Sequence, residues 1–113
     1  MEQERRRMPR YSFIATAEIV EERSEARIAT RVSELSLQGC YLDMMNPFPT
    51  GTLVLVKIWG DAAYFEARAR IAYAHEHLGV GITFLEVTEK FAPVLQGWLD
   101  EAERKRKLSE GGD

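Results

Sequence analysis

The chain has 113 residues, of which 45% are apolar and 29% charged, and its formal net charge is −3. This predicts one small globular domain, and the negative charge argues against a general binder of DNA or RNA, which needs a broad basic surface. No apolar run is long enough for a transmembrane span, no signal peptide is expected, and the single Cys40 fits a reducing, cytoplasmic location.

Residues 1–10 are polar and rich in arginine, and we expect them to form a flexible arm. Pro9 disfavours helical geometry at Met8, so the arm is extended or turned. Arginine suits a phosphorylated purine ligand, because its guanidinium group binds two phosphate oxygens at once and also stacks on a base. Considered alone, however, this cluster is typical of a solvated basic tail.

Six segments between the arm and residue 86 have the pattern of short β-strands. The clearest alternation runs through Phe65, Ala67, Ala69, Ile71 and Tyr73, which we expect to face inwards together. Short strands separated by turn residues at this spacing predict a barrel or a sandwich. The expected strands cover residues 12–19, 27–32, 40–44, 53–59, 65–73 and 80–85.

The last part of the chain changes from a two-residue to a helical period, which predicts an amphipathic helix packed on an end or face of the barrel. Thr88 is the expected N-cap, although Pro93 is an alternative marker of the helix start. Residues 103–113 are interpreted as a charged tail that frays from Ser109. The expected apolar stripe comprises Phe91, Val94, Leu95, Trp98, Leu99 and Ala102.

The segment Glu34-Leu35-Ser36-Leu37-Gln38-Gly39 joins the second and third expected strands. Ser36 can hydrogen-bond either backbone or phosphate, and Gly39 can adopt positive φ or allow a ligand close to the backbone. Glu34 can accept hydrogen bonds from a guanine edge. An ordinary Ser/Gly turn remains the alternative reading. Cys40, which follows directly, is expected to be a small buried strand residue.

We expect no enzyme activity and no metal site. His75 and His77 flank Glu76 in an expected hairpin turn, without the further ligands that a metal ion needs, so a solvated turn is expected. Ser36 has no histidine base in its own motif, and the sequence has no phosphate-binding P-loop.

Taken together, these features resemble the PilZ domain, a bacterial receptor module for cyclic di-GMP. The family's RxxxR motif precedes its first strand, where this chain has Arg6-Arg7-Met8-Pro9-Arg10, and its [D/N]xSxxG motif corresponds to the segment from Glu34 to Gly39. The stretch from Ala69 to Phe84 is also similar to the family's last hairpin. The resemblance covers about Arg5 to Leu99, and the order and spacing of its parts make it specific.

The resemblance implies a mainly β fold, a six-stranded antiparallel β-barrel with a C-terminal α-helix over residues 11–102. It also implies that the arm of residues 1–10 folds over cyclic di-GMP on the outer surface of the barrel. Glu34 departs from the family's Asp or Asn, reaching about 1.5 Å further, which shifts or weakens its contacts. The implied ligand-binding residues are Arg6, Arg7, Arg10, Glu34, Ser36 and Gly39.

Three functions remain open from the sequence. The first is a cyclic di-GMP receptor that signals to a protein partner in motility, secretion or polysaccharide synthesis. The second is a PilZ-like interaction module that binds no nucleotide, and a homodimer stays open for either. The third is a small barrel that binds single-stranded RNA through its arm and exposed aromatics such as Tyr41 and Trp59. The net charge weighs against the third, and the intact arginines weigh against the second.

Overall fold

The structure is a computed structural model that describes residues 9–110. Its six strands and one helix follow the predicted order, with each strand bounded by the expected turn residues. No helix of the described part is long and apolar enough to cross a membrane. The elements are β1 (Tyr11–Glu21), β2 (Arg27–Leu35), β3 (Gly39–Met44), β4 (Leu53–Trp59), β5 (Tyr64–His75), β6 (Leu78–Glu86) and α2 (Ala92–Glu110).

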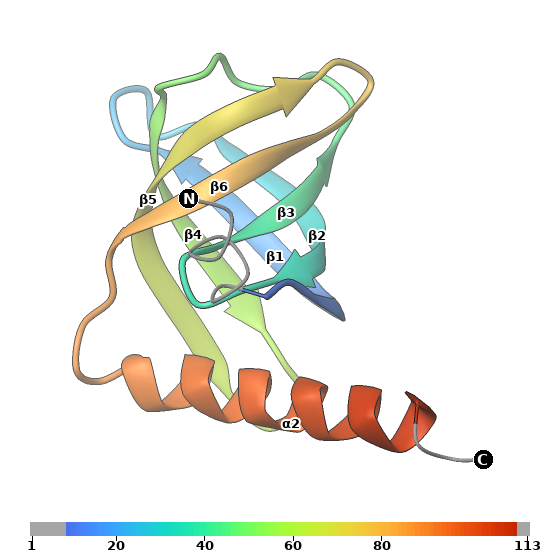
Figure 1. Ribbon diagram of the computed structural model, residues 1–113. Helices are drawn as coiled ribbons and strands as arrows, with labels where there is room; N and C mark the ends of the chain where they lie inside the picture. Colours follow the sequence, from blue (N-terminus) through green and yellow to red (C-terminus); the bar gives the residue numbers. More distant parts are fainter. Residues whose placement is uncertain (1–8, 111–113) are drawn as a thin grey trace, which may run out of the picture.

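The strands close into an antiparallel barrel in the order β1-β2-β3-β6-β5-β4, with β4 paired to β1 (Figure 1). The prediction of a six-stranded barrel is therefore confirmed, and the sandwich alternative is wrong. The apolar row of each strand faces the common interior, and the pairing of β4 with β1 distinguishes this barrel from a sandwich. In β4 that row is Val54, Val56 and Ile58, each fully buried.

The inner row of β3 includes Cys40, which is 8% exposed, so the prediction of a buried thiol is confirmed. Burial raises the pKa of the Cys40 thiol to about 12, because the thiolate would lose its hydration in an apolar interior. The thiol therefore stays protonated at neutral pH.

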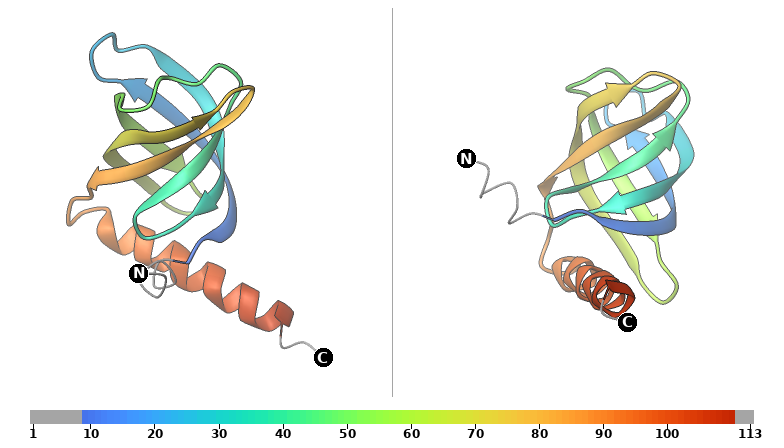
Figure 2. Two further views of the ribbon diagram at one scale, coloured as in Figure 1. Left: turned by 45° about the horizontal axis from the view of Figure 1, so that its top comes forward. Right: turned by 45° about the vertical axis from the view of Figure 1, so that its right-hand side comes forward.

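Helix α2 lies across one end of the barrel, as both views in Figure 2 show. Leu95 and Leu99 of its apolar stripe are buried, and other members of the stripe pack on the core, as expected. Aromatic rings close this end, with Phe65 at their centre, fully buried and 6.1 Å from the Trp98 ring. We call this group the end cluster; its members are Phe13, Phe65, Phe91 and Trp98.

The boundaries of α2 differ from the prediction at both ends. The helix begins at Ala92 rather than directly after Thr88, and the Thr88 carbonyl accepts the N–H groups of Phe91 and Ala92 in the turn that leads into it. Pro93 fits the first helical turn because its missing N–H needs no partner there. The helix also continues to Glu110, so residues 103–110, which the sequence suggested as a tail, form its last turns.

Strands β2 and β3 share only a short ladder. Their partners run from Leu35 and Cys40 to Val32 and Leu42, with a bulge between Val32 and Glu34. Strand β1 accompanies β2 much further, to Arg27. Residues 27–31 of β2 consequently have a neighbouring strand on one side only.

Candidate functional site

Pairing of β1 with β2 brings the two sequence motifs together. Tyr11 lies opposite Leu35 and Ser12 opposite Glu34, so Arg10, at the entrance to β1, lies beside the motif at the end of β2. The Nη1 atom of Arg10 is 3.8 Å from the Oε1 atom of Glu34. Of the predicted arginines, Arg6 and Arg7 lie outside the described residues.

The Arg10 side chain is available to a ligand. It is 63% exposed, its partner Glu34 is 48% exposed, and their ion pair is long, so solvent screens it and an incoming anion can replace it. Arg10 also donates a long hydrogen bond, 3.5 Å, from Nη1 to the Tyr73 hydroxyl. The guanidinium group therefore already lies over the outer surface of the barrel.

Ser36 organises the turn between β2 and β3. Its Oγ atom accepts the N–H groups of Gln38 at 3.3 Å and Gly39 at 3.2 Å, while the Ser36 N–H donates to the Gly39 carbonyl at 2.8 Å. These bonds form the turn without any ligand. The sequence suggested either backbone or phosphate as the hydrogen-bond partner of Ser36, and in this structure the partner is the backbone.

Gly39 allows β3 and β6 to approach closely, and the positive φ that the sequence offered as one of its two roles is wrong. It has no positive φ, and a Cβ atom built on it would lie 1.8 Å from the carbonyl oxygen of Ile82. Gly39 pairs with Thr83 of β6, so the neighbouring strand occupies the space that a side chain would need. Glycine is needed here because any side chain would push β3 away from β6.

An aromatic group that sequence analysis did not identify as a site covers the outer face beside Arg10. Tyr41 of β3 and Tyr73 of β5 lie 6.3 Å apart between ring centroids, and the His75 ring is 5.9 Å from Tyr41 and 5.2 Å from Tyr73. His75 Nδ1 and the Tyr41 hydroxyl are within hydrogen-bonding distance, 3.1 Å. We call Tyr41, Tyr73 and His75 the outer cluster.

Two glycines of β6 form the floor of the outer cluster. Side-chain atoms of Tyr41 lie 2.6 Å from a Cβ built on Gly79, and those of Tyr73 lie 2.2 Å from one built on Gly81. The rings therefore lie flat against bare backbone. The sequence pattern from which this floor could have been predicted is the alternation Gly-Val-Gly-Ile in residues 79–82. It places both glycines on the outer face and the branched residues inside.

The sequence placed Tyr73 with the inward row of β5, and this is wrong. Ile71 lies opposite Ile82, but Tyr73 lies opposite Gly81, so two residues of β5 match one residue of β6. This bulge reverses the side-chain alternation, and Tyr73 emerges on the outer face. Alternation in sequence does not reveal a bulge, which explains the error.

The outer cluster has a polar and partly negative setting. Burial raises the pKa of the Tyr41 hydroxyl, and the nearby Tyr73, Asp43 and Glu34 raise it further because each disfavours a second negative charge. The Tyr41 side chain therefore remains a hydrogen-bonding hydroxyl at neutral pH. Their rings are half-buried, with one face on glycine, so an added flat ring finds an apolar surface with polar edges.

The histidines meet the prediction of a solvated turn only in part. His77 is in the β5–β6 turn, exposed and with φ of 65°, whereas His75 ends β5 and belongs to the outer cluster. Within residues 9–110, no three His, Cys, Asp or Glu side chains group closely enough to hold a metal ion.

Several solved structures have a fold similar to that of this chain. The chain is similar to the solved PilZ domain of YcgR from Escherichia coli with c-di-GMP, at 18% identity and a TM-score of 0.73, covering 95% of this chain and 98% of that one. It is similar to the PilZ domain of CeSA from a cellulose-synthesizing bacterium, at 18% identity and a TM-score of 0.63, covering 79% and 96%. A search of curated proteins gave no match.

A third similar structure is the Bacillus subtilis inhibitor of motility (MotI/DgrA), at 15% identity and a TM-score of 0.71, where the match covers 88% of this chain and 50% of that one. At these identities the likeness concerns the fold. The family itself follows from a separate match, because the model of the PilZ domain matches residues 4–101, from the arginine-rich arm to the helix on the barrel. The chain belongs to the PilZ domain family.

Proposed function

We propose that this chain is a receptor for cyclic di-GMP rather than an enzyme, and that the nucleotide lies on the outer face of the barrel between the arginine arm and the outer cluster. One observation carries the proposal: Arg10, Glu34 and Tyr73, from three separate segments, meet on that face. This gathers a phosphate-binding cation, a carboxylate and an aromatic ring around one exposed area. A similar solved structure, the YcgR PilZ domain, carries c-di-GMP.

Each group has a distinct proposed role. Arg10 exchanges its ion pair with Glu34 for a phosphate oxygen, and Arg6 and Arg7 add further guanidinium groups from the arm. Glu34, once released, accepts hydrogen bonds from a guanine edge. Tyr73 and Tyr41 offer ring faces on which a base stacks. Ser36 and Gly39 act indirectly, by fixing the turn that presents Glu34.

The signal then passes to a protein partner in motility, secretion or polysaccharide synthesis. A ligand that binds over the arm replaces a cationic patch with a nearly neutral one, and a partner can distinguish the two states. Two of the similar structures support this range of outputs: one is an inhibitor of motility, and the other comes from a cellulose-synthesizing bacterium.

A second candidate is a PilZ domain that binds partners without nucleotide. The observation in its favour is that Ser36 and Gly39 are fully used by the fold, so their presence does not require a ligand. The RNA-binding alternative has less support. Trp59 packs with Tyr64, whereas Tyr41 packs with Tyr73 and His75, so the two rings named for it belong to different clusters.

Calorimetric titration of the full chain with cyclic di-GMP, with GMP as the control ligand, tests the proposal. We expect binding to cyclic di-GMP and a loss of about 30- to 150-fold in affinity for Arg10→Ala, as for the removal of charge-assisted hydrogen bonds worth about 2–3 kcal/mol. Arg27→Ala is the matched control, because Arg27 is 59% exposed and also pairs with one carboxylate, that of Glu18.

Two results would contradict the proposal. Absence of heat with cyclic di-GMP would favour the second candidate. Equal losses for Arg10→Ala and Arg27→Ala would mean that any exposed cation matters and that Arg10 is no specific anchor.

A further inference from the structure

A groove opens where β2 and β3 separate, at the opposite end of these strands from Glu34. The β2–β3 ladder stops at Val32 and Leu42, while β2 continues to Arg27 with β1 alone beside it. Strand β3 continues to Met44, paired on its other side with β6. Residues 27–31 therefore present a strand edge that has no ladder partner in β3.

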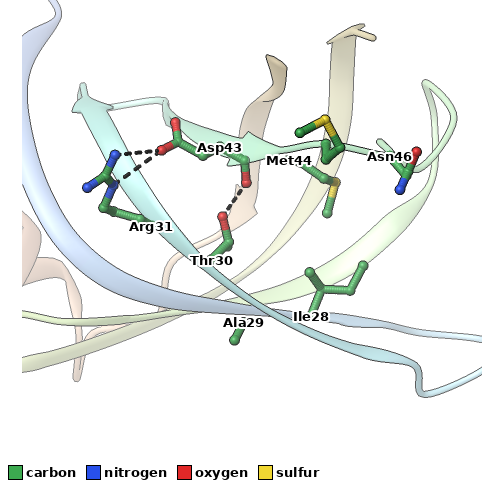
Figure 3. Close-up of a pocket in the computed structure, with 8 residues that line it drawn as sticks. Ile28, Ala29, Thr30, Arg31, Asp43, Met44 and Asn46 are labelled. Carbon is green, nitrogen blue, oxygen red and sulfur yellow. Dashed lines mark hydrogen bonds and ion pairs between the residues drawn. The ribbon is translucent and has the colours of Figure 1, made fainter. Parts of the chain in front are cut away.

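The groove has a volume of about 450 Å³ and is drawn in Figure 3. Its apolar wall comes from Ile28, Met44 and Met45, and Met45 is 65% exposed. Thr30 bridges the strands by donating from its hydroxyl to the Asp43 carbonyl. At this polar end, Arg31 Nη2 lies 3.1 Å from Asp43 Oδ2, so the local charges are already paired.

We propose that this groove binds an extended segment of a partner protein, which adds a strand to the free edge of β2 and places an apolar side chain against Met45 and Ile28. A free edge presents N–H and C=O groups that an extended chain satisfies. Methionine side chains adapt to apolar groups of different shape. Since the local charges are paired, apolar side chains at alternate positions select the segment.

A second copy of this chain is a poorer occupant. In a two-fold antiparallel pairing centred on Ala29, Arg27 of one copy would lie opposite Arg31 of the other, and like charges directly opposite destabilise a sheet. A heterologous peptide need not place a cation opposite either arginine.

The test is selection from a phage-displayed library of random dodecapeptides on the full chain, without nucleotide. We expect enriched peptides with apolar residues at every second position. Their binding should fall about tenfold or more in Met45→Asp. Ile14→Asp is the matched control, because Ile14 is 66% exposed and lies on β1 away from the groove. Titration into the isotopically labelled chain should shift the amide signals of residues 27–31 and 43–46.

Strand addition makes a further demand on the peptide backbone. Alternate N–H groups of a bound strand point towards its neighbour, so N-methylation at one set of alternate positions should abolish binding and at the other set should be tolerated. The inference is overturned if no peptide is enriched, if both methylation sets are tolerated, or if Met45→Asp binds like Ile14→Asp. It is also overturned if the signals of residues 27–31 shift with protein concentration alone, which would identify a second copy as the occupant.

Discussion

The end cluster and the outer cluster are both built from aromatic rings, but they are covered differently. In the end cluster, the fully buried Phe65 pairs with Phe84 of β6 at 5.3 Å and with Phe91 and Trp98 on the helix side, and Trp98 in turn pairs with Phe13 of β1. In the outer cluster, Tyr41 and Tyr73 rest on two glycines and keep one half open, and their polar groups contact His75 and Arg10.

The difference indicates separate roles. A ring buried on all sides contributes its apolar area to folding, about 25 cal/mol for each Å². A ring laid on backbone with one open face contributes less, and the remaining area is available to a ligand. We therefore expect stability to depend mostly on the end cluster and ligand binding mostly on the outer cluster, and four predictions test that division.

Phe65→Ala should have the largest effect on stability, about 3–5 kcal/mol, because it leaves a cavity at the centre of the end cluster. Leu99→Ala, from the helix side of the same interface, should cost about 2–5 kcal/mol and provides a second variant if the first does not fold. Urea unfolding measures both. Losses below about 1 kcal/mol would mean that the helix contributes little to holding the barrel closed.

Gly81→Ala should cost about 1–3 kcal/mol, because the new methyl group would meet the Tyr73 ring. The cost should shrink when Tyr73 is also replaced by Ala, so a double-mutant cycle isolates the ring from other effects. Gly97→Ala is the control: nothing lies within 4 Å of its added Cβ, and in a helix the change should stabilise by about 0.5–1 kcal/mol. Additive effects of Gly81→Ala and Tyr73→Ala would refute the ring–glycine contact.

The pH dependence of stability tests whether water is excluded from the Cys40 thiol, on the inner side of β3 behind the outer cluster. Its pKa is about 12 in the fold and near 9 when exposed, so above pH 9 the unfolded chain releases a proton that the folded chain keeps. The stabilising effect of the protonated thiol is complete below pH 9 and is lost as pH rises towards 12. The wild type should lose about 1.4 kcal/mol more than Cys40→Ala between pH 8 and 10. Parallel pH profiles of the two proteins would show that water reaches the thiol.

The Arg10–Glu34 pair should have the smallest effect on stability, less than about 1 kcal/mol, because the two side chains are 63% and 48% exposed. A cycle of Arg10→Ala and Glu34→Gln, followed by thermal unfolding in low and high salt, measures it. A larger coupling, or one insensitive to salt, would mean that the pair stabilises the barrel and is not free for a ligand.

The barrel could be predicted from sequence because each strand keeps one apolar row, as Val54, Val56 and Ile58 do in β4. The helix was predictable from the spacing of Leu95, Trp98 and Leu99, although not its start. Thr88 is an N-cap by residue type, but its carbonyl closes the turn that precedes Ala92, and residue type alone does not place the first helical residue.

The candidate site was only partly predictable. The meeting of Arg10 and Glu34 follows from the pairing of β1 with β2, which motif order already implied. The outer cluster depends on the bulge before Tyr73 and on β6 lying between β3 and β5. Both the bulge and the strand order are properties of the closed sheet, and they cannot be predicted from the sequence of one strand at a time. The groove beside β2 was missed for the same reason.

The close approach of Gly39 to Ile82 changes what the second motif reports. Its glycine is demanded by the contact of β3 with β6, and its serine by the turn, so both would be retained in a domain that had lost its ligand. A match to the whole motif therefore combines residues that the fold requires with residues that we propose for ligand binding. Arg10 and Glu34, by contrast, are exposed and paired at 3.8 Å, so the fold makes no comparable demand on their side chains.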